Sequence, residues 1–197
     1  MRRWLVPLLG VATVLALIAG PVVYAFHEDK QMPNFRVVRD GVLYRSAQMT
    51  LPGLKRAVHD YGIRTVICLR DGLTAADQAE EKFCAAADVR FVRIPPSGWG
   101  DVGGVVPVEE GVRKFRAILA DPKNYPVLVH CFAGVHRTGA YAAIYRMEFE
   151  RWSNARAIAE MKACGYNNLD DEWDILGYLE QYRPSWLPPP EPAPHDE

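Results

Sequence analysis

The stretch HCFAGVHRTG, residues 130–139, directly follows the apolar run PVLV and contains a thiol and a guanidinium six positions apart. A loop that leaves a buried strand and opens a helix aims its backbone N–H groups at a common point, and the helix N-terminus adds partial positive charge. Such a loop binds anions. The amide donors of this predicted cradle belong to Phe132, Ala133, Gly134, Val135 and His136.

Cys131 lies at the floor of the predicted cradle, and the guanidinium fork of Arg137 could hold two oxygens of a bound phosphate. The same surroundings favour the thiolate, because they lower a cysteine pKa to somewhere within ~3.5–7.5. The pattern predicts attack of the Cys131 sulfur on phosphorus, a phosphocysteine, and its hydrolysis by water, with no metal or cofactor. We expect Thr138 to stabilise the departing thiolate, and His130 to hold the loop and tune the thiol.

The leaving oxygen needs a proton, and a general acid contributes ~10²–10⁴-fold to such a step. The glycine-rich loop PPSGWGDVGGVV offers Asp101, which lies 30 residues before the thiol at the outlet of a neighbouring strand. Glu109 and Glu110 are the alternatives, although they belong to a helix whose face is less suited to point inward. We therefore predict Asp101 as the acid.

Strands and helices alternate along residues 35–182. Alternation around Asp40-Gly41 predicts a hairpin over 35–46, and short apolar runs predict strands at 65–69, 90–94 and 126–130. Helical periodicity predicts helices at 51–62, 75–87, 108–119, 138–152, 154–164 and 170–182, with Ser153 and Asp170 as caps. The fold class is therefore α/β, with one mixed, largely parallel sheet flanked by helices and the cradle beyond the carboxyl ends of its strands.

These motifs resemble a known family. HCFAGVHRTG is similar to the CxxxxxR(S/T) signature of cysteine-dependent protein tyrosine and dual-specificity phosphatases, and Trp99-Gly100-Asp101 looks like a variant of their WPD acid loop. The stretches GVLYRSAQ, 41–48, and TVICLRDG, 65–72, resemble the small bacterial and fungal dual-specificity members, some of which act on inositol pyrophosphates. The resemblance spans about residues 34–182. It implies a phosphatase fold with Cys131 as nucleophile, Arg137 as phosphate clamp and Asp101 as acid.

The loop departs from one pattern within that family. Members that act on inositol phosphates or phospholipids often carry Lys or Arg within the loop, whereas here only His136 could add charge, and only when protonated. This favours a single phosphate ester, such as phosphotyrosine on a protein or a small phosphate ester. The alternatives are an inositol (pyro)phosphate or phospholipid phosphatase, a non-catalytic module that binds phosphorylated ligands, and a sulfur-transfer enzyme of rhodanese type.

The N-terminal run is expected to lie outside the fold. Residues 1–26 begin with Arg2 and Arg3 and then stay uncharged from Trp4 to Phe26, which as a helix would reach roughly 35 Å at ~1.5 Å per residue. The run predicts a membrane anchor through residues 4–26, or a cleaved signal peptide ending near Val23-Tyr24-Ala25. Two arginines at the start predict a catalytic domain outside the cytoplasm (periplasmic in a bacterium), or secreted after cleavage.

The remaining chain divides into a phosphatase domain over 27–183 and a proline-rich, disordered tail over 184–197. With 23 Lys and Arg against 24 Asp and Glu, the formal net charge is -1, and no long basic run predicts nucleic-acid binding. The oligomeric state is not indicated. Four cysteines could form two disulfides, but Cys68, Cys84 and Cys164 fit small core residues better; Cys68 or Cys84 could also pair reversibly with Cys131.

Overall fold

The computed structural model of the chain describes residues 13–21 and 30–188. Its centre is a five-stranded sheet in the order β1-β2-β5-β3-β4. The strands are β1 Arg36–Arg39, β2 Leu43–Ser46, β3 Thr65–Cys68, β4 Arg90–Arg93 and β5 Val127–His130. The β1–β2 hairpin is antiparallel, and β2, β5, β3 and β4 run parallel to one another. The mixed, largely parallel α/β sheet predicted from the sequence is therefore confirmed.

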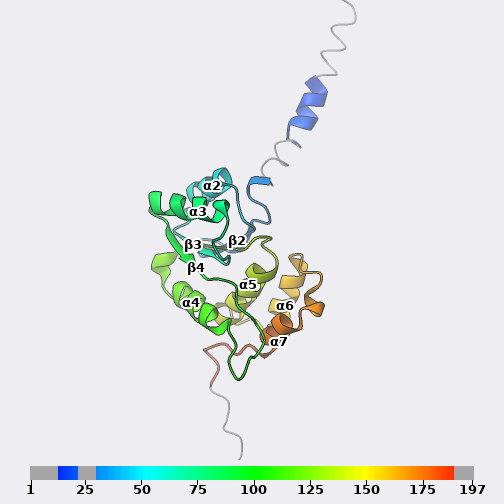
Figure 1. The fold of residues 1–197 in the computed structure, drawn as a ribbon. Coiled ribbons are helices and arrows are strands. Elements are labelled where there is room, and N and C mark those ends of the chain that lie inside the picture. The colour runs from blue at the N-terminus through cyan, green and yellow to red at the C-terminus, as the bar shows by residue number, and fades with distance from the viewer. Residues whose placement is uncertain (1–12, 22–29, 189–197) are drawn as a thin grey trace, which may run out of the picture.

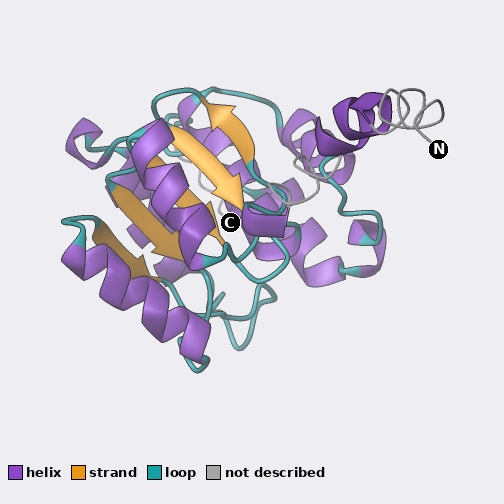
Figure 2. Cartoon of the chain, turned by 90° about the horizontal axis from the view of Figure 1, so that it is seen from above, coloured by secondary structure: helices purple, strands orange, loops and turns teal. Residues whose placement is uncertain are grey.

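Helices cover both faces of this sheet (Figures 1 and 2). They are α2 Leu51–Tyr61, α3 Ala75–Ala86, α4 Glu109–Leu119, α5 His136–Phe149, α6 Asn154–Ala163 and α7 Trp173–Gln181, with short 3₁₀ turns at Pro122–Asn124 and Leu169–Asp171. In Figure 1, α2 and α3 lie on one side of the strands, and α4, α5, α6 and α7 lie on the other. The sheet is thus the middle layer of three.

Alternating strand residues supply two separate cores. Val66 and Leu128 pack with α2 and α3, whereas their neighbours Ile67 and Val129 pack with α4 and α5. Because successive side chains of a strand point to opposite faces, a strand covered on both sides must be apolar throughout. The continuous apolar runs of the sequence are explained by this double burial.

The parallel strands end at one edge of the sheet. Cys68, the last residue of β3, is in register with both His130 of β5 and Arg93 of β4. The loops that follow these three strands therefore start side by side, and those after β4 and β5 contain the residues that the sequence predicts to be functional. This edge is where the site is built.

Side-chain caps set the start of three of these six helices. Thr50 caps α2, Ser153 caps α6 as expected, and Thr74 and Asp77 form a reciprocal capping box at α3. The prediction that Asp170 caps the last helix is wrong. Asp170 lies in a 3₁₀ turn and pairs with Lys162 Nζ at 2.6 Å, and α7 begins only at Trp173.

The helix of the cradle begins two residues earlier than predicted and ends earlier as well. It runs from His136 to Phe149 rather than over 138–152. Its start lies directly inside the predicted anion cradle, so the free N–H groups of its first turn face that loop. Arg151, with a φ of 57°, adopts a left-handed conformation that the helix cannot continue through.

The predicted membrane segment needs correction. In the part of the chain that the structure describes, no helix is both long and apolar enough to span a membrane. Residues 1–12 and 22–26 of the prediction lie outside the described residues. The prediction of a membrane anchor is thus contradicted, and the extracytoplasmic placement is withdrawn. The cleaved signal peptide stays a prediction.

The first residues after the last helix contact the fold. The backbone N–H of Ser185 donates to Glu148 of α5 at 3.1 Å, and Trp186 Nε1 donates to the carbonyl oxygen of Met147 at 3.0 Å. The tail predicted to be disordered from residue 184 is therefore packed against α5 as far as Trp186. Residues 189–197 lie outside the described residues.

Candidate active site

The loop between β5 and α5 is fixed by hydrogen bonds to three consecutive carbonyl groups. Each carbonyl accepts a bond from a different segment that packs behind the loop. The bonds are Gln48 N–H to Phe132 O at 3.0 Å, Asn34 Nδ2 to Ala133 O at 2.8 Å, and Arg45 Nη2 to Gly134 O at 2.8 Å. Since C=O and N–H point in opposite directions across a trans peptide, the N–H groups of residues 133–135 face the other way, into the loop. The predicted anion cradle is therefore present before any ligand arrives.

Gly134 is required by this geometry. Its φ is +70°, and a Cβ placed on it would come within 2.4 Å of Ala47 N and 2.6 Å of Ser46 O. Any side chain would therefore push the loop away from the segment that holds it. The position tolerates only glycine.

Cys131 lies under this ring of amides. Its side chain is buried, with 2% of its surface exposed, and its sulfur accepts the Gly134 N–H at 3.2 Å. Burial alone would raise the pKa of the Cys131 thiol. The hydroxyl and backbone N–H of Thr138, the Gly134 N–H and the charge of Arg137 outweigh burial, and the pKa falls below its ordinary value. The site thus favours a thiolate.

Arg137 projects from the first turn of α5 and is half-buried. Its Nη1 donates to the carbonyl oxygen of Leu69, just beyond β3, at 2.6 Å. A guanidinium has five N–H donors, so this bond orients the group and leaves the other donors for an anion. Arg137 also borders a small pocket together with Pro95 and Trp99 from the loop that follows β4.

Asp101 lies in that same loop but in a different pocket. Its Oδ1 accepts the Gly104 N–H at 2.8 Å, so the carboxylate shapes a turn at the surface. Trp99, buried to 6% exposure, anchors the base of the loop by edge-on contacts with Tyr141 and Tyr178. Asp101 borders an open pocket of about 510 Å³ that includes Trp99 but not Arg137.

Of the two alternative acids, Glu109 borders the same pocket as Asp101 and Glu110 does not. Glu109 accepts a hydrogen bond from the Tyr178 hydroxyl at 2.8 Å, which commits it to the contact between α4 and α7. Glu110 is exposed and borders a separate pocket with Pro107 and Lys114. Asp174, which sequence reasoning did not consider, borders the same pocket as Asp101.

The exposed part of the loop is apolar and aromatic. Phe132 has 68% of its surface exposed, and the guanidinium of Arg70 lies over its ring at 5.2 Å from the centroid. Arg70 is also bound by the Asp77 carboxylate, with Nε to Oδ1 at 2.5 Å. On the other side of the loop, the His136 ring stacks on Tyr166 at 4.4 Å.

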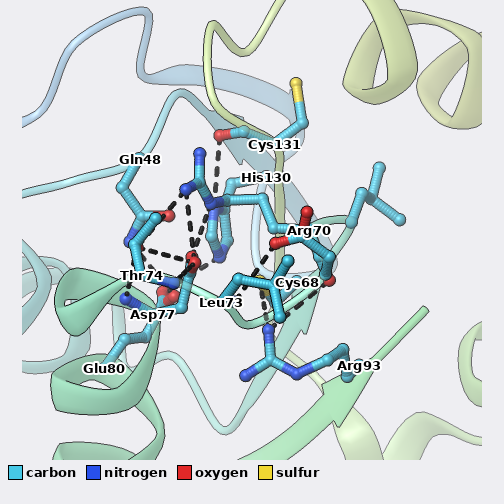
Figure 3. A network of polar contacts seen from close by, with 12 residues as sticks. Gln48, Cys68, Arg70, Leu73, Thr74, Asp77, Glu80, Arg93, His130 and Cys131 are labelled. Atoms are coloured by element: carbon cyan, nitrogen blue, oxygen red, sulfur yellow. Dashed lines mark hydrogen bonds and ion pairs between the residues drawn. The ribbon is translucent and has the colours of Figure 1, made fainter. Parts of the chain in front are cut away.

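His130 is buried behind Cys131, in the network of Figure 3. Its Nε2 lies 2.9 Å from Glu80 Oε1, and its Nδ1 lies 3.4 Å from the carbonyl oxygen of Cys131. Burial would lower the pKa of His130, but Cys68 and Glu80 together raise it to about 10. The surroundings of His130 therefore favour its charged form.

One cluster in the described chain has the composition of a metal site. Ligand atoms of Cys68, Glu80 and His130 lie within 4.8 Å of one another, and all three are buried. Arg93 Nη1 also donates to the Cys68 sulfur at 3.4 Å. Arg93 thus faces the Cys68 sulfur and His130 faces the Glu80 carboxylate, an arrangement that fits a network of polar contacts. All four cysteines of the chain are free thiols.

Known proteins share this arrangement. A family model described as "DSP-PTPase phosphatase fused to NAD+ Kinase" matches residues 21–173. The chain belongs to this phosphatase family. It is a cysteine-dependent phosphatase of the protein tyrosine and dual-specificity type, as its sequence resemblance implied.

Relatives and solved structures agree with the phosphatase assignment. Dual specificity protein phosphatase TpbA of Pseudomonas aeruginosa (strain UCBPP-PA14) is 28% identical over 187 residues, covering 89% of this chain and 79% of that protein. Inositol diphosphatase DSP1 of Oryza sativa subsp. japonica is 31% identical over 119 residues, covering 60% of this chain and 51% of that protein.

The crystal structure of P. aeruginosa TpbA superimposes with a TM-score of 0.60 at 27% identity, covering 76% of this chain and 85% of that one. The catalytic core of the PP-IP phosphatase SIW14 from S. cerevisiae shares the fold, with a TM-score of 0.60 at 21% identity over 77% of this chain and 86% of that one. A TpbA variant has been solved in complex with phosphotyrosine, with a TM-score of 0.56 at 27% identity over 71% of this chain and 79% of that one.

Proposed function

We propose that Cys131 is the nucleophile of this phosphatase and Arg137 its phosphate clamp. The observation that carries the proposal is the environment of the Cys131 sulfur, which is buried, accepts the Gly134 N–H at 3.2 Å, and has a lowered thiol pKa. A thiolate is the reactive form of cysteine, and the donors that stabilise it also bind the oxygens of a phosphate. One set of groups therefore prepares the nucleophile and holds its target.

The reaction runs in two steps. The Cys131 sulfur attacks phosphorus, so that an S–P bond forms while the ester P–O bond breaks and the leaving oxygen takes a proton. The amides of residues 132–136 and the Arg137 guanidinium stabilise charge on the equatorial oxygens. Water then attacks phosphorus, the S–P bond breaks and phosphate is released. The Thr138 hydroxyl, which lowers the pKa of the Cys131 thiol, stabilises the departing thiolate.

Asp101 is our proposed proton donor for the leaving oxygen and, in the second step, the acceptor of a proton from water. Its support is its place in the loop after β4, held by the buried Trp99 next to the pocket of Arg137. In the ligand-free protein, Asp101 shapes a surface turn, so its use as an acid requires this loop to close over bound substrate.

We propose a single phosphate ester as the substrate, with phosphotyrosine on a protein as the preferred case. The exposed Phe132 offers an aromatic surface at the rim, and the loop positions 132, 133 and 135 carry no basic side chain. The charge of Arg70, which lies over Phe132, is already engaged by Asp77. A TpbA variant in complex with phosphotyrosine supports the same choice by similarity.

An inositol diphosphate is the second candidate, because several relatives, including the one from Oryza sativa, are named inositol diphosphatases. Against it, a densely charged ligand needs several free cations around the loop. A phosphate-release screen of phosphotyrosine and phosphoserine peptides, an inositol diphosphate and a phospholipid would decide between the classes. Faster release from the inositol diphosphate than from the phosphotyrosine peptide would overturn our preference.

The nucleophile is tested by Cys131→Ser, with Cys164→Ser as the matched control. We expect Cys131→Ser to lower turnover of p-nitrophenyl phosphate by more than about 10⁴-fold while inorganic phosphate still binds, because the cradle amides remain. Cys164, half-buried at the end of α6, should be replaceable without loss. Retained turnover in Cys131→Ser would remove the residue from its proposed role.

A further inference from the structure

We propose that Glu80 is a positioning residue for Cys131, holding His130 in its charged form and bracing the phosphate loop through Gln48. The inference rests on the proposed role of Cys131 as nucleophile. Glu80 belongs to α3, on the far side of the sheet from α5, and does not touch the sulfur. It would act through its neighbours alone.

The two oxygens of Glu80 reach two different supports of the loop (Figure 3). Oε1 lies 2.9 Å from His130 Nε2, and Oε2 accepts a hydrogen bond from Gln48 Nε2 at 3.2 Å. His130 directly precedes Cys131, and the backbone N–H of Gln48 donates to Phe132 O at 3.0 Å. One carboxylate is therefore connected to both sides of the nucleophile.

The partners of the His130 ring favour its doubly protonated form. Nε2 faces a carboxylate oxygen, and Nδ1 faces the carbonyl oxygen of Cys131 at 3.4 Å. Both partners are oxygen atoms that accept hydrogen bonds, so a ring that carries hydrogen on both nitrogens suits them best. Nδ1 is on the Cys131 side and Nε2 on the Glu80 side, so the ring of this ion pair contacts the backbone carbonyl of the nucleophile's own residue.

The burial of Glu80 indicates a role beyond stability. Glu80 is 3% exposed and His130 1% exposed, and the desolvation of such a pair costs about as much as the attraction between its members returns. A well-packed apolar pair would stabilise the fold at least as well. Glu81, the next residue on the same helix, has a side chain that is 57% exposed and pairs with Arg93 at the surface. The buried acid is therefore a specific requirement of this position.

Other charged groups around this pair belong to neighbouring strands and helices. Cys68 of β3 faces His130 and receives a hydrogen bond from Arg93 of β4, and the Arg70–Asp77 pair lies beside them. On the other side, the Cys131 sulfur is influenced by Arg137, Arg45 and Tyr166. Glu80 is the carboxylate in this described set that faces His130, and its replacement leaves the cations nearest the Cys131 sulfur in place.

The test measures the thiolate directly. In the full chain with Cys164→Ser, the rate of Cys131 alkylation by iodoacetamide is followed from pH 4 to 10, with the modified residue identified by mass spectrometry. We expect Glu80→Gln to raise the midpoint of this alkylation curve by about one pH unit. At pH values below the midpoint, about tenfold less Cys131 would then be in the thiolate form. The acidic limb of kcat/KM for p-nitrophenyl phosphate should move with it. Glu81→Gln on the same helix is the control and should move neither.

A folded Glu80→Gln protein with an unshifted midpoint would overturn the proposal for Glu80. If that variant does not fold, the unaltered protein decides, because His130 ring ¹⁵N shifts at pH 8 must show an imidazolium; a neutral ring would also overturn the proposal. Failure of the nucleophile assignment is distinguishable in the same experiment. In that case alkylation of Cys131 in the unaltered protein would leave turnover intact, whatever Glu80→Gln does.

Discussion

Arg45 lies beneath the phosphate loop, where its Nη2 donates to the carbonyl oxygen of Gly134 at 2.8 Å. The residue is 3% exposed, and burial lowers the pKa of its guanidinium below the ordinary value. Burying a charged side chain costs free energy unless the charge is paired or hydrogen-bonded. Here it fixes the peptide that precedes Val135, and so aims one of the amides of the cradle.

We expect Arg45→Lys to weaken the cradle without removing the nucleophile. A lysine is shorter, and its compact ammonium cannot reproduce the guanidinium fork. Loss of a buried hydrogen bond to a charged group costs about 1–3 kcal/mol, so kcat/KM should fall by roughly 5- to 100-fold, with weaker inhibition by inorganic phosphate. Arg36→Lys on the exposed strand β1 is the control. An Arg45→Lys enzyme with unchanged phosphate inhibition would show that the Gly134 carbonyl needs no anchor.

The role of Asp101 is tested with leaving groups of different basicity. Replacement by Asn should slow phenyl phosphate by ~10²–10⁴-fold, because a basic leaving oxygen depends on the acid, and should slow p-nitrophenyl phosphate far less. Asp174→Asn is the informative comparison, since Asp174 borders the same pocket. If Asp101→Asn slowed both substrates equally, or if Asp174→Asn selectively slowed phenyl phosphate, a residue other than Asp101 would be the proton donor.

The Arg70–Asp77 pair predicts a specific dependence of stability on pH. Burial would raise the pKa of Asp77, but hydrogen bonds from Arg70 and Thr74 hold it at about 2, below the ordinary 3.8. A depressed carboxyl pKa contributes stability that is present above the unfolded value and is lost as the pH falls through the folded value. Asp77→Asn should therefore lower the free energy of unfolding by about 2 kcal/mol at pH 7, and the difference should vanish near pH 2.

Urea denaturation at pH 7 and pH 2 measures this difference. The control is Asp71→Asn, an exposed neighbour whose replacement should change stability by less than about 0.5 kcal/mol. A difference for Asp77→Asn that persisted unchanged at pH 2 would mean that the pair with Arg70 does not account for it.

The order of elements and the phosphate loop could be predicted from the sequence, because both are local patterns. Apolar runs such as Thr65–Cys68 can only be strands covered on both faces, and a thiol and a guanidinium at this spacing specify the loop. The prediction of a helix cap at Asp170 was wrong because a local pattern does not show which partner a side chain will find. Aspartate can cap a helix, but it can also pair with lysine, and here Asp170 pairs with Lys162 of α6.

The supports of the loop could not be predicted in the same way. Asn34, Gln48 and Glu80 reach it from three separate segments, and their partners are set by packing rather than by spacing. Glu80 in an alanine-rich helix resembles any surface acid. The sequence gives one indication that Glu80 is buried. It lies three residues after Asp77 and four before Cys84, so all three share the buried face of α3.

The contacts of residues 31–34 set a limit on how far the chain can be shortened from its N-terminal side. Asn34 holds Ala133 O, Pro33 O accepts the Ala47 N–H at 2.8 Å, and Gln31 O accepts the Thr50 N–H at 3.2 Å. Trimming that stops before Gln31 leaves these bonds in place. Trimming past Asn34 removes the hydrogen bond that holds Ala133 O in the loop between β5 and α5, although that loop lies almost a hundred residues further along the chain.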